Sequence, residues 1–331
     1  IFAGTLIFYT CGKSQPQTDN QIYIGVACYD QKDTFIEELV DAFKEQCSSM
    51  ESKDYAISMT IMDASNSQRV QNDQIEQMIN DGCNVLCVNL ADRTEPSEII
   101  DAAKEKDIPI IFFNREPVEE DMRRWDKLYY VGGKAKQSGE LQGELAADFI
   151  KVNPQADRNN DGKIQYVILE GEMGHQDAII RTESVVESLK ANDISLEKLS
   201  YQIANWNRAQ AQTRMMQLIG QYKTNIEMVI ANSNSMALGA IDAYEKLGYT
   251  ESNIPVFFGI DGTDEGLEAV QKGKIAATVD NDKEGQAKAM AELVIAAVTG
   301  KEMEDIQFEN NRYIYLPYKK VTKENVETMI K

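Results

Sequence analysis

The stretch IYIGVACYDQKD, residues 22–33, decides the fold class of this chain. It is a short run of mostly apolar, β-prone residues that ends in polar residues, and a helical pattern near Phe35–Cys47 follows it. A run of this kind followed by an amphipathic helix predicts one strand and one helix of a βα unit. The stretch therefore predicts a strand whose carboxyl end carries acidic side chains.

The same unit recurs along the chain. Alternating strands and helices predict parallel sheets that are covered by helices on both faces. The strands are too many for one comfortable open sheet, so two sheets of similar size are expected, an α/β fold of two lobes. The further strand-like runs are Tyr55–Asp63, Val85–Asn89, Pro109–Asn114, Tyr129–Gly132, Ile164–Glu170, Leu199–Ala204, Met228–Asn232, Val256–Gly259 and Ala277–Asp280.

The order of these units predicts where the chain changes lobe. The first crossing is expected near Gly132-Gly133, and the second after Ala277–Asp280, with helix Gly285–Thr299 packing back on the first lobe. A strand at Tyr313–Leu316 and a tail helix would then return the chain to the second lobe. The expected N-terminal lobe is 22–133 plus 280–314, and the C-terminal lobe is 134–279 plus 315–331.

Charge and composition exclude several classes of function. The chain has 331 residues and a formal net charge of -20, which repels nucleic acid and anionic lipid. It has one histidine, His175, so a zinc site with several histidines is excluded. The five cysteines show neither zinc nor disulfide spacing, and buried free thiols are expected.

The start of the chain differs from the rest. Residues 1–10 are uncharged and mostly apolar, Cys11 follows them, and a polar linker continues to residue 21. We interpret residues 1–21 as a signal-peptide remnant and a lipoprotein-like linker, with Cys11 as a lipid attachment site; a cleaved leader is the alternative. Either interpretation places the protein outside the cytoplasm.

Polar side chains follow the predicted strands at equivalent positions, and two large aromatic residues lie among them. Ligands of open parallel sheets bind beyond the carboxyl ends of the strands. Planar Asp, Asn and Arg groups suit paired hydroxyls, and aromatic rings suit the flat faces of a pyranose. These residues predict a sugar site, although Asn, Asp and Ser after strands are also ordinary turn and N-cap residues. The set includes Asp33, Phe35, Asn114, His175, Asp177, Trp206, Asp261 and Asn281.

The segment DRNNDGKIQ, residues 157–165, has the ligand spacing of an EF-hand calcium loop, with Gly162 at its sharp turn. Ile168 stands where the usual bidentate Glu would be, so a distant carboxylate would have to complete the shell. The loop predicts a structural calcium ion, and the alternative is a polar turn before a strand. The ligands within the loop would be the side chains of Asp157, Asn159, Asp161 and Gln165 and the carbonyl of Lys163.

At this point the chain resembles the bacterial D-galactose/D-glucose-binding proteins, periplasmic-binding-type receptors of ABC importers. The resemblance runs from about Ile22 to the C-terminus and is carried by FFNREP at 112–117, the loop 157–165, GHQD at 174–177 and QAKA at 286–289. It implies two Rossmann-like lobes joined by three crossings. It also implies a monomer that binds D-galactose or D-glucose and serves a membrane permease and, in some relatives, a chemoreceptor.

The resemblance also implies the role of each site residue. Phe35 and Trp206 would sandwich the sugar ring, and Asp33 would bind the 4-hydroxyl of either epimer. Ser233 replaces a sugar-binding Asn of the family, and Glu227 would supply the remote calcium ligand. The other hydroxyls and the ring oxygen would bind Asn114, His175, Asp177, Arg181, Asp261 and Asn281.

Two other classes of function compete with a transport receptor. Asp33, His175, Asp177 and Asp261 could serve a sugar-active enzyme as acid and base, but no nucleophile elbow, Walker loop or dinucleotide fingerprint is present. A sugar sensor is the second rival. Only about twenty residues precede the first strand, too few for a helix-turn-helix, whereas a sensor-kinase partner stays open.

Overall fold

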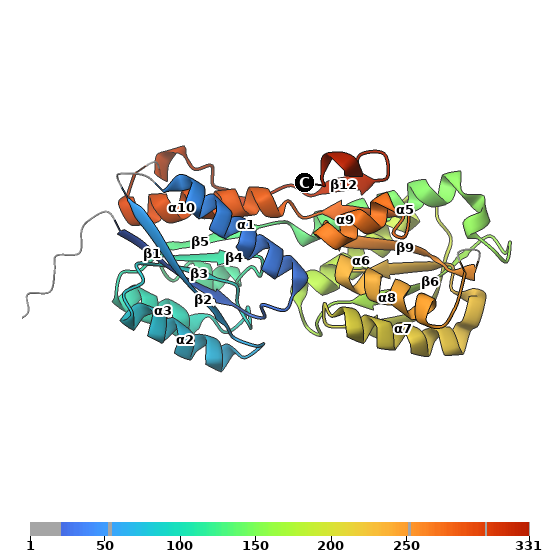
Figure 1. The fold of residues 1–331 in the computed structure, drawn as a ribbon, viewed down its shortest axis with the longest axis horizontal. Helices are drawn as coiled ribbons and strands as arrows, with labels where there is room; N and C mark the ends of the chain where they lie inside the picture. The colour runs from blue at the N-terminus through green and yellow to red at the C-terminus, as the bar shows by residue number, and fades with distance from the viewer. Residues whose placement is uncertain (1–20, 52–54, 251–252, 302, 331) are drawn as a thin grey trace, which may run out of the picture.

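A computed structural model describes residues 21–51, 55–250, 253–301 and 303–330. The chain forms two α/β lobes side by side along the long axis of the molecule (Figure 1), which confirms the predicted fold class. The expected lipid attachment at Cys11, and all of segment 1–21 except Gln21, lie outside the described residues. No helix in the described ranges is long and apolar enough to cross a membrane.

The first lobe is built on a six-stranded sheet of order β11-β5-β4-β3-β1-β2, all of whose pairs are parallel. Apolar residues at helical spacing on each helix face this sheet, as in α1, where Phe35, Leu39 and Phe43 are buried. The elements are β1 Gln21–Cys28, α1 Thr34–Met50, β2 Ala56–Asp63, α2 Gln68–Asn80, β3 Val85–Val88, α3 Ser97–Glu105, β4 Ile110–Phe113, α4 Glu119–Met122, β5 Leu128–Gly132, α10 Lys283–Thr299 and β11 Tyr313–Tyr315.

The second lobe repeats the arrangement with a six-stranded sheet of order β12-β10-β9-β8-β6-β7. Its central strands are wholly buried, which explains their continuous apolar sequence. The elements are α5 Ala135–Val152, β6 Ile164–Glu170, α6 Gln176–Ala191, β7 Leu196–Ile203, α7 Arg208–Tyr222, β8 Met228–Ala231, α8 Asn234–Lys246, β9 Val256–Asp261, α9 Asp264–Gln271, β10 Ala277–Asp280 and β12 Lys319–Thr322.

The chain passes between the sheets three times. It leaves the first sheet after β5, returns through α10, which packs on α1, and crosses again between β11 and β12. The expected tail helix is wrong: residues 319–322 form β12, antiparallel to β10, and within the described residues up to 330 only a 3₁₀ turn at Val326–Thr328 follows. This edge strand has a single fully buried apolar residue, Val321, so its sequence lacks a strand pattern.

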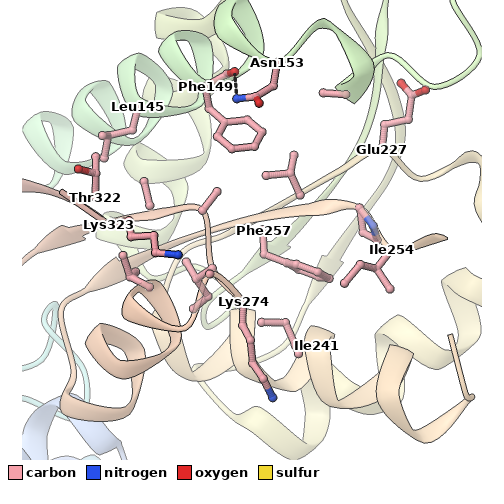
Figure 2. Close-up of a pocket in the computed structure, with 18 of the residues that line it drawn as sticks. Leu145, Phe149, Asn153, Glu227, Ile241, Ile254, Phe257, Lys274, Thr322 and Lys323 are labelled. Carbon is pink, nitrogen blue, oxygen red and sulfur yellow. Dashed lines mark hydrogen bonds between the residues drawn. The ribbon is translucent and has the colours of Figure 1, made fainter. Parts of the chain in front are cut away.

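Each sheet has a point where the strand order reverses, between β1 and β3 in the first and between β6 and β8 in the second. Ligands of doubly wound folds bind at the carboxyl ends of the strands beside such a point. In the second lobe, a separate and larger cavity lies at the opposite, amino ends of the strands (Figure 2). The four described cysteines, Cys28, Cys47, Cys83 and Cys87, are buried free thiols as predicted.

Candidate ligand-binding cleft

The carboxyl ends of strands from both sheets meet around one cavity between the lobes. Nine of the ten predicted sugar-binding residues line it. Asn281 does not; it is buried, and its Oδ1 accepts a hydrogen bond of 3.0 Å from Gln286 Nε2 at the start of α10. The nine lining residues are Asp33, Phe35, Asn114, His175, Asp177, Arg181, Trp206, Ser233 and Asp261.

Backbone conformation helps to place these side chains. Asn114, Trp206 and Asp261 have φ values of 60°, 57° and 105°, in the left-handed region that non-glycine residues rarely adopt. Such conformations persist only where the surrounding structure determines them, and they concentrate at functional sites. The strand ends are therefore shaped to project these three residues into the cleft.

Two aromatic side chains face the cavity from different lobes. Phe35 lies in the first turn of α1 in the first lobe, and Trp206 follows β7 in the second. Trp206 packs against the backbone of Gly171, where a Cβ atom would come within 2.1 Å of the indole, so only glycine fits there. The His175 ring meets the indole edge-on, with centroids 5.3 Å apart. The indole is thus held on one wall.

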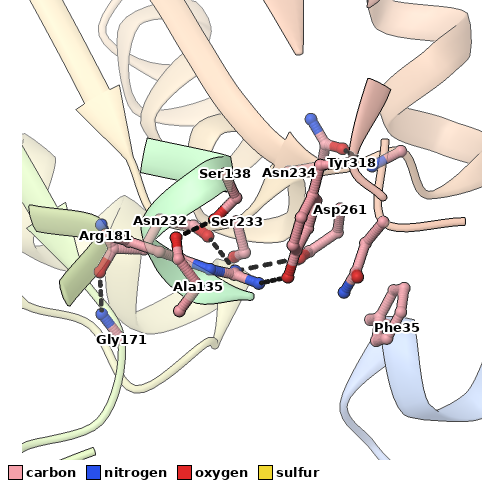
Figure 3. Close-up of polar contacts among 12 residues, drawn as sticks. Phe35, Ala135, Ser138, Gly171, Arg181, Asn232, Ser233, Asn234, Asp261 and Tyr318 are labelled. Atoms are coloured by element: carbon pink, nitrogen blue, oxygen red, sulfur yellow. Dashed lines mark hydrogen bonds and ion pairs between the residues drawn. The ribbon is translucent and has the colours of Figure 1, made fainter. Parts of the chain in front are cut away.

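Arg181 anchors the polar part of the second-lobe wall (Figure 3). Its Nη1 donates to the carbonyl of Asn232 at 2.8 Å and lies 3.1 Å from Asp261 Oδ1, and its Nη2 bonds the Tyr318 hydroxyl at 3.2 Å. The Arg181 Nε is buried and has no hydrogen-bond partner among the described residues, and the same is true of His175 Nδ1. Buried polar groups normally have partners, so these two nitrogens of residues that line the cavity have hydrogen-bonding capacity to spare.

Burial sets the protonation of the cleft. It raises the pKa of Asp261 to about 6, although the neighbouring Arg181 partly offsets the effect. Burial also raises the pKa of Asp33 and Asp177 above the usual range. Burial and the nearby Arg115 hold the pKa of His175 well below its ordinary value, so this ring is neutral at pH 7. The cleft therefore combines one neutral imidazole with carboxylates that are hydrogen-bond acceptors at neutral pH.

Direct contacts close the cleft around this cavity. Arg115 of the first lobe forms an ion pair with Glu172 of the second at 2.7 Å, and Ser235 Oγ donates to Thr34 Oγ1 at 3.1 Å. The remaining free space is about 30 Å³, enough for a water molecule but not for a six-membered sugar ring. A sugar can therefore enter only when the lobes separate.

Sequence reasoning missed three lining residues, Tyr29, Arg115 and Ser235. The Arg115 guanidinium stacks on the Tyr29 ring, 3.5 Å from its centroid, and the Tyr29 hydroxyl donates to Asp33 Oδ2. Tyr29 ends the first apolar run and Arg115 directly follows Asn114, so their positions at strand ends were available signals. Ser235 lies in the first turn of α8, and its sequence position gave no such signal.

The predicted calcium loop forms a polar turn before β6. Asp157 Oδ2 accepts from the Gly162 amide at 2.9 Å, and Asp161 Oδ1 accepts from the Lys163 amide at 2.8 Å. The Asn159 and Gln165 side chains bond each other at 3.0 Å. No group of three or more His, Cys, Asp and Glu side chains within the described ranges is placed to hold a metal ion.

The remote carboxylate of the predicted calcium site, Glu227, does contact this loop. It is buried, with its Oε1 accepting from the Arg158 amide at 2.7 Å and its Oε2 accepting from the Gln165 amide at 3.1 Å. Both Glu227 oxygens thus accept backbone N–H groups of the loop, which holds this carboxylate against it. The donor set still consists of the hard oxygen ligands that calcium prefers.

The fold and the cleft together define a two-lobed binding protein that encloses a polar ligand between its lobes. The sequence profile of the periplasmic binding protein domain matches residues 24–302. The chain belongs to this family, whose members are extracytoplasmic binding proteins and not enzymes.

Two similar proteins and one solved structure show how closely the chain resembles individual members of the family. The chain is 36% identical, over 95% of its length and 92% of the relative's, to the D-galactose/methyl-galactoside binding periplasmic protein MglB of Haemophilus influenzae. It is 30% identical to a putative rhizopine-binding protein of Rhizobium meliloti, over 83% and 84% of the two lengths. A solved ABC transporter solute binding protein of Bacillus halodurans, with bound myo-inositol, superposes with a TM-score of 0.77 at 29% identity, covering 95% of this chain and 98% of the other.

Proposed function

We propose that this chain is the extracytoplasmic sugar receptor of an ABC importer and that its ligand is D-galactose or D-glucose. Two independent lines support the sugar: the Haemophilus influenzae relative is a D-galactose/methyl-galactoside binding protein, and the cleft has the chemistry of a pyranose site. The observation that carries the proposal is that Phe35 and Trp206, from different lobes, line the same closed cavity together with acidic and amide side chains.

The proposed roles follow from donor and acceptor chemistry. Phe35 and Trp206 would stack on the two faces of the ring, while Asp33, Asp177 and Asp261 would accept hydrogen bonds from hydroxyls. Arg181 and neutral His175 would use the nitrogens that now lack partners. An Asp can accept from a 4-hydroxyl in either orientation, so one site would hold both epimers. Asn114 would bond the remaining hydroxyls or the ring oxygen, whereas Asn281 would need a rearrangement to reach the sugar.

Buried polar atoms make this cleft selective. A sugar that lacks one hydroxyl would leave a buried partner unsatisfied, which costs about 1–3 kcal/mol. Ser233 is the exception, because its Oγ already accepts from the Met236 amide as the N-cap of α8 and its side chain is shorter than the Asn that it replaces in the family. We expect the hydroxyl that faces Ser233 to be held less tightly than the others.

Transport would depend on closure. Sugar would bind to separated lobes, bridge them, and shift the population to a closed form whose interlobe cavity is wider than the one described here. The permease, and in addition a chemoreceptor, would recognise the closed surface. Attachment of lipid to Cys11 would hold the receptor at the membrane.

A structural calcium ion in the 157–165 loop is part of the proposal. The ligands would be side-chain oxygens of Asp157, Asn159, Asp161, Gln165 and Glu227 and the Lys163 carbonyl. The ion would neutralise carboxylates gathered beside β6 and β8 and would tie the loop to the sheet. It would have no part in sugar chemistry.

Small-angle X-ray scattering tests the closure on which the function depends. Bound ligand can be removed by unfolding the protein in denaturant, dialysing it and refolding it. The refolded protein should show a smaller radius of gyration when D-galactose is added. Equal scattering with and without the sugar, at concentrations that saturate binding, would contradict the proposed mechanism.

A further inference from the structure

The second lobe contains a cavity that no part of the proposed sugar function uses. It lies at the amino ends of the strands, whereas the interlobe cleft lies at their carboxyl ends (Figure 2). Its volume is about 1000 Å³, at the upper end of the range of about 300–1,000 Å³ that is typical of small-molecule sites. The cavity is therefore large enough for a ligand of one or two rings.

Aromatic and aliphatic side chains line this amino-end cavity. Phe149 of α5 and Phe257 of β9 approach it from different elements, as Figure 2 shows, and Ile241 of α8 and Ile254 lie near Phe257. Ligand pockets are mostly apolar with a few polar groups that fix orientation. The lining thus favours a largely apolar molecule.

Tyr244 supplies an independent observation. Its side chain lines the amino-end cavity and is 1% exposed, and its hydroxyl has no hydrogen-bond partner among the described residues. Its ring is fixed by edge-on contacts with Tyr249 and Phe257, at centroid distances of 5.3 and 5.9 Å. A buried hydroxyl without a partner is rare in native proteins, and a ligand acceptor would satisfy it.

Charge around the cavity argues against an ionic ligand. Four basic and four acidic side chains line it, in a chain whose net charge is -20. Lys274 is paired with Glu245 at 2.7 Å, and Lys272 with Glu268 at 2.7 Å. The cavity therefore presents no net charge to a ligand, and attraction must come from apolar area and hydrogen bonding.

We propose that the amino-end cavity is a second ligand site, which takes a neutral, flat, aromatic molecule with a hydrogen-bond acceptor that meets the Tyr244 hydroxyl. Its occupant would differ in chemistry from the sugar of the cleft. Ligand bound there would contact β9 and α5 and leave the interlobe cavity free.

Prodan, a neutral naphthalene ketone whose emission moves to shorter wavelength in apolar surroundings, is a suitable probe. Titrated into the full chain, it should bind at one saturable site with a blue shift. Ala276→Trp, which places an indole in the cavity, should abolish the shift. Trp206→Ala, in the interlobe cleft, should leave prodan affinity unchanged.

Tyr244→Phe separates a ligand-binding hydroxyl from a structural one. It should weaken prodan binding about three- to tenfold through the lost hydrogen bond, and it should raise the melting temperature because it removes an unsatisfied buried group. Unchanged prodan affinity in this variant would overturn the role of the hydroxyl.

Hydrogen–deuterium exchange gives a test that does not depend on whether Ala276→Trp folds. Prodan should slow amide exchange in the described segments 254–258 and 274–277 of the wild-type chain. The proposal would be overturned by absence of saturable binding, by protection confined to the loops of the interlobe cleft, or by loss of binding in Trp206→Ala.

Discussion

Arg115 Nη2 of the first lobe lies 2.7 Å from Glu172 Oε2 of the second, so an ion pair bridges the two lobes at the edge of the cleft. The Arg115 side chain is 4% exposed and also stacks on Tyr29, whereas Glu172 is 36% exposed. The same arginine thus lines the ligand cavity and joins the lobes. Ligand binding and closure therefore share a residue.

Glu172→Gln should weaken sugar binding about three- to tenfold, because the closed form loses an ion pair while the open form does not. The loss should shrink at high ionic strength, where the wild-type pair is screened. Isothermal titration calorimetry at two salt concentrations measures both effects. The matched control is Asp107→Asn, which removes a 2.8 Å ion pair to Lys127 within one lobe and should not change affinity. Equal affinities of wild type and Glu172→Gln would contradict this account.

Trp206→Ala should reduce sugar affinity at least about thirty-fold, or about 2 kcal/mol, since it removes one of the two ring surfaces that enclose the sugar. Trp125, the other tryptophan, packs in the core of the first lobe outside the cleft. Trp125→Phe should leave affinity unchanged. If both variants bind as the wild type does, in protein that circular dichroism shows to be folded, the ring sandwich is wrong.

Sugar affinity should fall about three- to tenfold between pH 7.5 and pH 5. Asp261, whose pKa burial raises to about 6, becomes protonated in this window and loses acceptor capacity. Asp261→Asn should reduce the pH step, whereas Asp280→Asn should retain it in full. The pKa of Asp280 is likewise about 6, but this residue does not line the cleft. An identical pH profile in Asp261→Asn would refute the assignment.

Thermal stability separates this effect from acid unfolding. Because the folded-state pKa of Asp261 is raised above the unfolded value of 3.8, its contribution to stability is present below pH 3.8 and is lost as pH rises through about 6. Lowering the pH from 7.5 to 5 should therefore weaken sugar binding. Over the same range, the protonation of Asp261 should by itself increase the free energy of unfolding. Comparison of the melting temperatures of wild type and Asp261→Asn across this pH range shows whether the Asp261 contribution to stability rises or falls with pH.

Chelation by EGTA should lower the melting temperature by roughly 5–10 °C, if calcium at about a hundred times its dissociation constant contributes about 2.7 kcal/mol to a lobe of this size. Glu227→Gln should be less stable and insensitive to EGTA. Differential scanning calorimetry with and without added calcium distinguishes the cases. A wild-type melting temperature that EGTA leaves unmoved would show that the 157–165 loop is only a turn.

Local pattern predicts most of this fold from sequence. Strands Ile164–Glu170 and Ala277–Asp280 are predicted with the bounds that the structure shows, because each is an apolar run with polar ends. Strand β12 could not be predicted in this way. It owes its conformation to pairing with β10, about forty residues away, and not to its own residues.

The cleft residues that follow strands could be predicted from the sequence, because the order of strands and helices places them. Side chains after parallel strands must gather at one edge of a sheet, which is why Asp33 and Asn114 of the first lobe, and Asp177 and Asp261 of the second, line one cavity although they are distant in sequence. The Arg115–Glu172 pair and the amino-end cavity depend instead on how lobes and helices pack in three dimensions. Tyr244, for example, has the spacing of an ordinary core residue, and only the structure shows its unpartnered hydroxyl.

Calorimetric titration of the ligand-free protein with D-galactose, D-glucose, D-ribose and myo-inositol tests the central claim most directly. We predict tight one-to-one binding of the two hexoses and weak or undetectable heat from ribose and myo-inositol. Binding of myo-inositol in preference to both hexoses, or no heat from either hexose, would contradict the claim that this cleft encloses galactose or glucose.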